Sequence, residues 1–298
     1  MRVVIIGLGS RGKRHLEVVG NQVVATVDPF NENASYKDIR ELNPDSYDIA
    51  IIATDEKSKV DLIENMLLQS KHVLVEKPLL TTISQLQNWD KKAAEKRLIL
   101  RVAYNHRYEF GVSKLHAMIE SRQLGRIYRL SIFYGNGTAQ NIKSSLWRNS
   151  LKAVSTDLLS HTLDLAMFLL NANCVEVKQL FESSYEIDGA DHAILVGKTV
   201  GVDLLLEASY ISWKNFFQIE LIAEYGSIKI RGLDKWGNHE IEEIRRVFPS
   251  GAPSLINHET PPKYDSTSHQ WNAFLNDIKL GNFKTNLERD ISILKALT

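Results

Sequence analysis

The chain of 298 residues contains a single cysteine, carries no net charge and lacks long apolar runs. Because Cys174 has no second cysteine to pair with, an internal disulfide framework and a cysteine-cluster metal site are excluded. The 36 basic residues balance the 36 acidic ones, which removes the electrostatic argument for a nucleic-acid or anionic-membrane partner. No run approaches the ~18 apolar residues of a membrane span, and the first residues do not resemble a signal peptide. We therefore expect a cytoplasmic protein without nucleic-acid or membrane partners.

A glycine-rich turn follows the first apolar run. Gly7, Gly9 and Gly12 have the spacing G-x-G-x-x-G, and a helical pattern comes after them. Gly7 allows a sharp turn, Gly9 lets a pyrophosphate approach the backbone, and Gly12 allows close helix–strand packing. The N–H groups of Ser10 and Arg11 open the helix, where the helix dipole favours an anion. We interpret the turn as a dinucleotide site; the alternative is an ordinary strand–turn–helix with incidental glycines.

Asp28 ends the second apolar run, residues 23–27. It follows Gly7 by close to the ~20 positions that separate the glycine turn from the ribose-binding acid in a dinucleotide fold. Its carboxylate can accept hydrogen bonds from ribose hydroxyls and would repel a 2′-phosphate. The sequence therefore favours NAD, with NADP as the alternative.

The two halves of the chain have different patterns. Up to about residue 104, apolar runs alternate with helical repeats, which predicts βαβ units and a Rossmann-type parallel sheet. From 126 to 248, successive strand-like runs predict an open, mainly antiparallel sheet in an α+β domain. Helices are expected at 154–170 and 268–280, and a long loop at 249–266. We predict a dinucleotide-binding Rossmann domain at 1–115 and a substrate-binding and oligomerisation domain at 116–298.

Polar residues follow the expected strands at the edge where a dinucleotide fold binds its ligand. Glu76 and Lys77 precede a proline that stops their strand. A lysine there can hydrogen-bond a substrate hydroxyl and stabilise a developing alkoxide, although a lysine at a strand end is usually only a surface residue. After the next strand, Asn105 can contact the nicotinamide or the substrate. Arg107 can pair with a phosphate or with a local acid such as Glu109.

Asp157, His161 and Asp164 share one face of the helix expected at 154–170, because positions i, i+4 and i+7 coincide. The rest of that helix is largely apolar, so these side chains need partners or a cavity. They can form a hydrogen-bonded network that braces the domain interface. Alternatively, His161 is a general acid–base with Asp157 beside it. A zinc site is the third option, but no further His or Cys is clustered nearby, and we expect no metal.

The loop before this helix contains Trp147 and Arg148. Such a pair can stack on a sugar or grip a phosphate, or it can anchor the loop to the core. His15, on the first helix, and Trp236 are expected to be packing residues.

Several motifs occur together in the order and spacing of the Gfo/Idh/MocA oxidoreductase family, which the chain resembles from residue 1 to about residue 170. They are GLGSRGKRH at 7–15, AT at 53–54, HVLVEKPL at 72–79, YNHRY at 104–108, LGRIY at 124–128 and DLLSHTLDL at 157–165. The resemblance implies an NAD(P)-dependent enzyme with catalytic Lys77, Asp157 and His161. It implies cofactor contacts at Gly7, Gly9, Ser10, Arg11, Gly12, Asp28, Thr54, Glu76, Lys77 and Asn105. It implies substrate contacts at Lys77, Arg107, Trp147, Arg148 and His161.

The resemblance also implies hydride transfer between nicotinamide and a secondary hydroxyl of a sugar, nucleotide-linked sugar or polyol, by a homodimer or homotetramer. Two alternatives stay open: glycoside cleavage or epimerisation with NAD recycled, and a non-catalytic NAD(H)-binding sensor. The chain departs from the family pattern at Asp55, usually proline, at Lys59, often histidine, and at Leu159, usually glycine. A glycine-rich turn is also replaced by residues 151–155. The larger side chains are expected to narrow the pocket or to move the helix.

Overall fold

The structure, a computed structural model, describes residues 1–298 except 145–148, 150–151, 238 and 262–263. The chain forms two compact units. The first unit comprises Met1–Asn105 and Thr267–Leu294, and the second comprises His106–Ser266 and Lys295–Thr298. The sequence predicted two consecutive domains, 1–115 and 116–298, whereas the structure places residues 267–294 with the N-terminal half.

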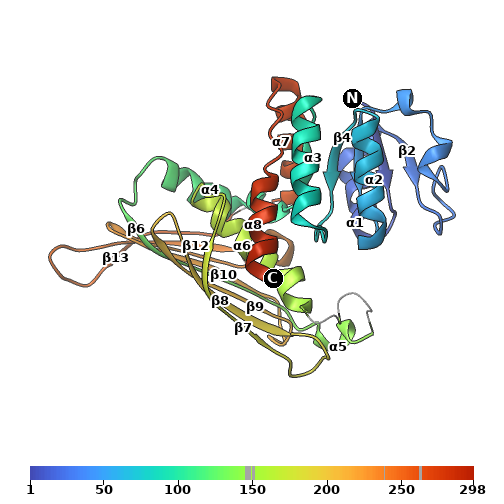
Figure 1. The fold of residues 1–298 in the computed structure, drawn as a ribbon. Helices are drawn as coiled ribbons and strands as arrows, with labels where there is room; N and C mark the ends of the chain where they lie inside the picture. Colours follow the sequence, from blue (N-terminus) through green and yellow to red (C-terminus); the bar gives the residue numbers. More distant parts are fainter. Residues whose placement is uncertain (145–148, 150–151, 238, 262–263) are drawn as a thin grey trace. The chain divides into compact units, whose positions relative to one another are not determined.

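The first unit is built on a five-stranded parallel sheet with the order β2-β1-β3-β4-β5 (Figure 1). Its strands are β1 (Val3–Ile6), β2 (Val23–Val27), β3 (Ile49–Ile52), β4 (His72–Val75) and β5 (Leu100–Val102). Every residue of β1 and β3 is buried, as expected for strands covered on both faces. The predicted Rossmann-type sheet is confirmed. The chain adds β2 on one side of β1 and the later strands on the other side. The point between β1 and β3 is therefore the topological switch point, where such sheets bind ligands.

Three helices follow β1, β3 and β4, and the last two begin with side-chain caps. They are α1 (Ser10–Val19), α2 (Glu56–Leu68) and α3 (Ile83–Glu95). The Asp55 carboxylate accepts a hydrogen bond from the Ser58 N–H at 3.1 Å and caps α2. Thr82 caps α3 in the same way through the Gln85 N–H. The proline usual at position 55 is thus replaced by a helix cap. The loop between β2 and β3 contains only short 3₁₀ turns within the described residues, among them Ile39–Glu41.

The C-terminal segment completes the core of the first unit. Helix α7 (Ser266–Leu280) contributes four buried apolar side chains to the cluster formed by alternate residues of β1 and β3. These side chains are Trp271, Phe274, Leu275 and Ile278. Arg101 of β5 also pairs with Asp277 at 2.8 Å. The last helix, α8 (Leu287–Leu297), was not predicted from the sequence.

The second unit contains an eight-stranded sheet with the order β13-β12-β11-β10-β6-β9-β8-β7. Every neighbouring pair is antiparallel except β6 with β9, so the predicted, mainly antiparallel sheet is confirmed. The strands are β6 (Ile127–Gly135), β7 (Glu176–Ser183), β8 (His192–Thr199), β9 (Val202–Ser209), β10 (Phe216–Ala223), β11 (Gly226–Arg231), β12 (Glu240–Arg245) and β13 (Ser254–Glu259).

The prediction of a continuous loop at 249–266 was wrong, because β13 lies within it. β13 pairs with β12 at the edge of the sheet, and most of its side chains are exposed. An edge strand that buries neither face has no apolar alternation, so no periodic pattern of apolar residues marks β13 in the sequence.

Helices cover one face of this sheet (Figure 1). Helix α4 (Phe110–Glu120) packs against α6 (Ser160–Leu169), and α6 packs on β6 and β9. A short helix, α5 (Ala139–Ile142), lies between α4 and α6 in the chain and belongs to the same unit. A π-helical turn, Ser155–Leu159, leads directly into α6, so the helix expected at 154–170 is wound unevenly. Leu159 is fully buried in that turn.

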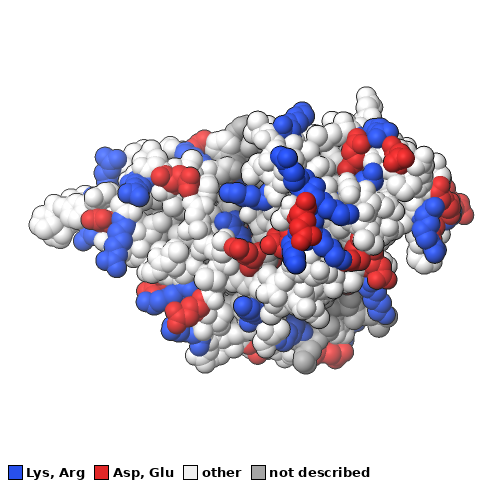
Figure 2. All heavy atoms as spheres, turned by 45° about the horizontal axis from the view of Figure 1, so that its top comes forward, with Lys and Arg blue, Asp and Glu red and all other residues white. Residues whose placement is uncertain are grey.

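Basic and acidic side chains are interspersed on the face shown in Figure 2. This pattern agrees with the equal numbers of basic and acidic residues. Among the described residues, no helix is both long enough and apolar enough to cross a membrane.

We expect Phe274→Ala to destabilise the first unit by about 3–5 kcal/mol, because it removes a fully buried ring from the core between α7 and the sheet. Denaturant unfolding followed by circular dichroism measures this. Leu280→Ala, at a 73% exposed position of the same helix, is the control and should change stability by less than about 0.5 kcal/mol. Equal effects would contradict the assignment of α7 to this core.

Candidate active site

The glycine turn joins β1 to α1 at the carboxyl edge of the parallel sheet. Gly7 has φ +93°, and a Cβ there would lie 2.6 Å from the Ala53 carbonyl oxygen. A Cβ on Gly12 would lie 1.8 Å from the Gly7 carbonyl oxygen, so only glycine permits this approach of helix and turn. A Cβ on Gly9 would meet nothing within 4 Å. The backbone is therefore open above Gly9, beside the first turn of α1, where the residues fit a dinucleotide pyrophosphate.

Asp28 ties the end of β2 to this turn. Its Oδ2 accepts a hydrogen bond from the Leu8 N–H at 2.7 Å, and its Oδ1 accepts from the N–H groups of Phe30 and Asn31 at 2.9 Å each. Burial acts to raise the pKa of Asp28, but these hydrogen bonds outweigh it and lower the pKa below its usual value. The side chain is thus a carboxylate at neutral pH and fits a ribose diol better than a 2′-phosphate.

Glu76, directly after β4, is buried and contacts two side chains of α1. Arg11 Nε donates to Glu76 Oε1 at 2.9 Å, and His15 Nε2 lies 2.7 Å from the same oxygen. Burial acts to raise the pKa of Glu76, but His15 and the Arg11 charge lower it to about 2. Sequence reasoning treated His15 as a packing residue and missed this role. His15 follows Arg11 by four residues and so lies on the same face of α1. This spacing was the signal in the sequence that the two side chains could contact the same group.

The other predicted residues of the first unit lie after neighbouring strands. Thr54 follows β3, Lys77 follows β4, and Asn105 opens a 3₁₀ turn after β5; all three are half-buried. With its amide oxygen turned toward them, Gln270 of α7 accepts hydrogen bonds from the N–H groups of Tyr104 and Asn105 at 3.2 Å. The C-terminal helix thus supports the turn that carries Asn105, a contact that sequence reasoning did not anticipate.

In the second unit, Asp157, His161 and Asp164 are all buried, and each has different neighbours. The Tyr210 hydroxyl lies 2.9 Å from Asp157 Oδ2. The His161 ring lies 4.7 Å from the His106 ring, centroid to centroid. Asp157 thus has a hydrogen-bond partner in the interior, as its burial requires.

Arg107 forms an ion pair with Asp164. Arg107 Nε donates to Asp164 Oδ2 at 2.8 Å, and a second guanidinium nitrogen contacts Asp164 Oδ1. Both side chains are buried. The sequence offered a phosphate or Glu109 as its partner, and the structure instead pairs Arg107 with Asp164, within the second unit. Glu109 contacts His106 Nδ1 at 3.0 Å; burial acts to raise the pKa of Glu109, but the hydrogen bond and charge of His106 lower it.

Tyr134, which sequence reasoning missed, lies beside His161 and also contacts the turn after β11. The Tyr134 ring lies 5.7 Å from the His161 ring, and Lys235 Nζ lies 3.4 Å from the Tyr134 hydroxyl. Lys235 also lies over the Trp236 ring at 5.0 Å. These residues come from β6 and from the turn after β11, so their spacing along the chain carries no hint of the cluster.

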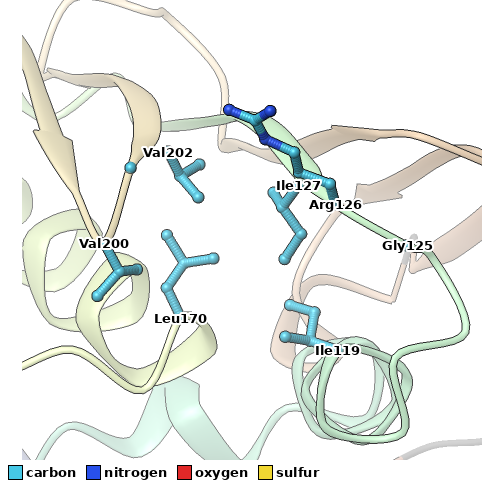
Figure 3. A pocket seen from close by; sticks show the side chains of 8 residues that line it. Ile119, Gly125, Arg126, Ile127, Leu170, Val200 and Val202 are labelled. Carbon is cyan, nitrogen blue, oxygen red and sulfur yellow. The ribbon is translucent and has the colours of Figure 1, made fainter.

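Trp147 and Arg148 fall outside the described residues. A pocket of about 300 Å³ in the second unit is lined mainly by aliphatic side chains and contains none of the predicted site residues (Figure 3). It is lined by Ile119, Gly125, Arg126, Ile127, Leu170, Val200, Gly201 and Val202. Among the residues that the structure describes, no group of three His, Cys, Asp or Glu is arranged to hold a metal ion.

Comparison with known proteins gives matches over both units. The inositol 2-dehydrogenase of Pseudomonas fluorescens is 27% identical over 201 residues, 61% of this chain and 58% of that protein. The myo-inositol 2-dehydrogenase of Thermotoga maritima is 22% identical over 217 residues, 67% of this chain and 61% of that protein. The chain thus spans less than two thirds of the length of these relatives.

A levoglucosan dehydrogenase solved in complex with NADH has the same fold, with a TM-score of 0.81 and 17% identity over 100% of this chain and 96% of that one. Residues 1–104 match the family model of an oxidoreductase with an NAD-binding Rossmann fold, and residues 112–229 match the GFO/IDH/MocA C-terminal domain. The chain therefore belongs to the Gfo/Idh/MocA family of oxidoreductases, and NAD is the cofactor of its Rossmann domain.

Proposed function

We propose that the chain is an NAD-dependent dehydrogenase or reductase that acts on a secondary hydroxyl of a sugar, nucleotide-linked sugar or polyol. The observation that carries this proposal is the sheet edge of the first unit, where the glycine turn, Asp28 and Lys77 follow three strands of one parallel sheet. The names of the relatives, two inositol dehydrogenases and a levoglucosan dehydrogenase, support a polyol or sugar substrate. NAD, when bound, supplies the hydride acceptor or donor.

The cofactor contacts divide into direct and supporting residues. We assign direct contact to the backbone of the turn, to the Asp28 carboxylate and to the residues at the strand ends. They are Gly7, Gly9, Ser10, Arg11, Gly12, Asp28, Thr54, Lys77 and Asn105. Glu76 has a supporting role in this proposal, because Arg11 and His15 already occupy its carboxylate.

In the proposed chemistry, the protein transfers the proton of the substrate hydroxyl and stabilises the negative charge that develops on the substrate oxygen. During oxidation, His161 takes the proton of the substrate hydroxyl, and it returns the proton during reduction. Lys77 hydrogen-bonds the substrate oxygen and stabilises its negative charge. Asp157, held by Tyr210, orients the proton-transfer group. Arg107 is left out of the substrate contacts, because Asp164 occupies its guanidinium.

We also propose that the chain forms a homodimer or homotetramer through the sheet face that α4 and α6 do not cover. Leu205 of β9 and Val196 of β8 are paired in register, and their exposed fractions are 41% and 39%. Phe181 of β7 is 50% exposed. Adjacent exposed apolar side chains of this kind favour association, and light scattering of the purified chain measures its oligomeric state. A cytoplasmic location remains a proposal from the sequence.

We expect Lys77→Ala to reduce kcat at least ~100-fold, because charge stabilisation at the substrate oxygen is lost. NADH affinity, measured by fluorescence titration, should change little. Lys57→Ala, at an exposed lysine of α2, is the matched control and should keep wild-type turnover. Full turnover of the Lys77 variant across a panel of polyols and sugars would refute the assignment.

We expect His161→Ala to lower kcat on the order of 10²-fold or more, because no other side chain is assigned to proton exchange. Steady-state kinetics at saturating NAD measures the loss. His258→Ala, on edge strand β13, is the control. A wild-type rate in the His161 variant would place His161 among the packing residues around His106.

We expect Asp28→Asn to lower the ratio of NADH to NADPH affinity about tenfold, because the charge that repels a 2′-phosphate is removed while an oxygen acceptor remains. Separate titrations with the two cofactors give the ratio. Asp45→Asn, an exposed carboxylate before β3, should leave the ratio unchanged. An unaltered ratio in the Asp28 variant would show that Asp28 does not select the cofactor.

A further inference from the structure

Glu109, the residue before α4, is a buried carboxylate that the proposed chemistry does not use. The residue is 2% exposed. Its Oε1 lies 3.0 Å from His106 Nδ1, and its Oε2 accepts a hydrogen bond from the Asp234 N–H at 3.1 Å. The two oxygens of Glu109 therefore join His106 to the turn that follows β11.

Asp234, in that turn, holds the Glu109 carboxylate in place. Its own N–H donates to Glu109, and its Oδ2 accepts a hydrogen bond from the Phe110 N–H, at the start of α4, at 3.5 Å. Its Oδ1 lies 2.5 Å from Nδ1 of His239, which is also buried. Because hydrogen bonds run in both directions between the turn and the start of α4, the turn and the Glu109 side chain fix each other.

The Glu109 carboxylate orients the His106 ring. Burial acts to raise the pKa of Glu109, but the hydrogen bond and the charge of His106 lower the pKa below its usual value. Glu109 is thus ionised at neutral pH, and an ionised carboxylate only accepts hydrogen bonds. His106 Nδ1 must therefore carry the proton of their contact, which sets the direction of its N–H bond and the plane of the ring.

The oriented ring of His106 packs against His161. The two ring centroids are 4.7 Å apart, with 51° between the ring planes. The His106 ring also contacts the Tyr134 ring at 5.4 Å and the Phe217 ring at 6.0 Å, centroid to centroid. Tyr134 in turn contacts His161. One neighbour of His161 is thus a ring whose own orientation is set by a buried carboxylate.

We propose that Glu109 is a positioning residue for His161 and that it acts through His106. The carboxylate holds the His106 ring, and this ring holds the His161 imidazole in the orientation that exchanges a proton with the substrate hydroxyl. A small misplacement of a reacting group lowers the rate strongly, because the reacting atoms must be aligned. This inference rests on the proton-transfer role proposed above for His161.

Glu109→Gln is the first test, because it keeps the size of the side chain and removes its charge. Glutamine has one acceptor oxygen for the two N–H groups that Glu109 accepts from, so one of the two contacts is lost. With the best substrate of a panel of polyols and sugars, kcat should fall about tenfold while the KM for NAD stays unchanged. Glu120→Gln, an exposed glutamate at the end of the same helix, is the matched control and should keep the wild-type kcat.

A double-mutant cycle separates positioning from a general effect on the fold. In His161→Ala there is no imidazole left to position, so adding Glu109→Gln should change the residual kcat by less than about twofold. A tenfold loss that persists in the His161→Ala background overturns the inference, because Glu109 then acts independently of His161. If Glu109→Gln does not fold, Glu109→Asp takes its place, because its shorter side chain keeps the charge and withdraws it from His106.

Nuclear magnetic resonance provides a readout that does not depend on turnover. In protein with ¹³C-labelled histidine and no cofactor, the Cε1–H resonance of His161 is identified by its loss in His161→Ala. Glu109→Gln should move this resonance, because neighbouring rings change their orientation, and Glu120→Gln should leave it in place. An unmoved His161 resonance in the folded Glu109 variant overturns the inference. Full activity of His161→Ala together with a moved resonance would refute the proposed function and leave the contact from Glu109 to His161 established.

Discussion

The buried carboxylate of Glu76 is the constraint on which the candidate site of the first unit depends. A carboxylate removed from water must be paired, and Arg11 and His15 of α1 provide the partners. The pairing joins the helix that begins at the glycine turn to the end of β4, and so to Lys77. Because one charge links both loops, the orientation of α1 and the position of Lys77 cannot vary independently.

The same requirement organises the second unit. Arg107 and Asp164 neutralise each other in the interior, and the Tyr210 hydroxyl satisfies the Asp157 carboxylate. Asp157 precedes His161 and Asp164 follows it, so these contacts fix the helix before and after His161. The π-helical turn that includes Asp157 sets the position of that carboxylate along the helix. The hydrogen-bonded network and the general acid–base, which the sequence offered as alternatives, are therefore compatible: the two carboxylates are paired, and His161 lies among aromatic rings.

The parts that could be predicted from the sequence depend on local rules. The glycine turn could be read because sterics allow only glycine at Gly7 and Gly12. Strand β13 was missed because an exposed edge strand lacks alternation. The role of His15 was missed because its partner lies 61 positions away. The return of α7 to the first unit was missed because an amphipathic helix shows that it has a buried face, but not which core the face joins.

The sequence by itself determined the two sheet types, the glycine turn and the residues able to perform the chemistry. These features follow from side-chain size, polarity and short spacings. Only the tertiary structure decided which buried charges meet: Glu76 with Arg11 and His15, Arg107 with Asp164, and Lys59 with the carbonyl of Pro78. Desolvation obliges each buried charge to find a partner, but the chain can satisfy that demand in many ways. The partner is chosen by packing between segments distant in sequence, which no local pattern records.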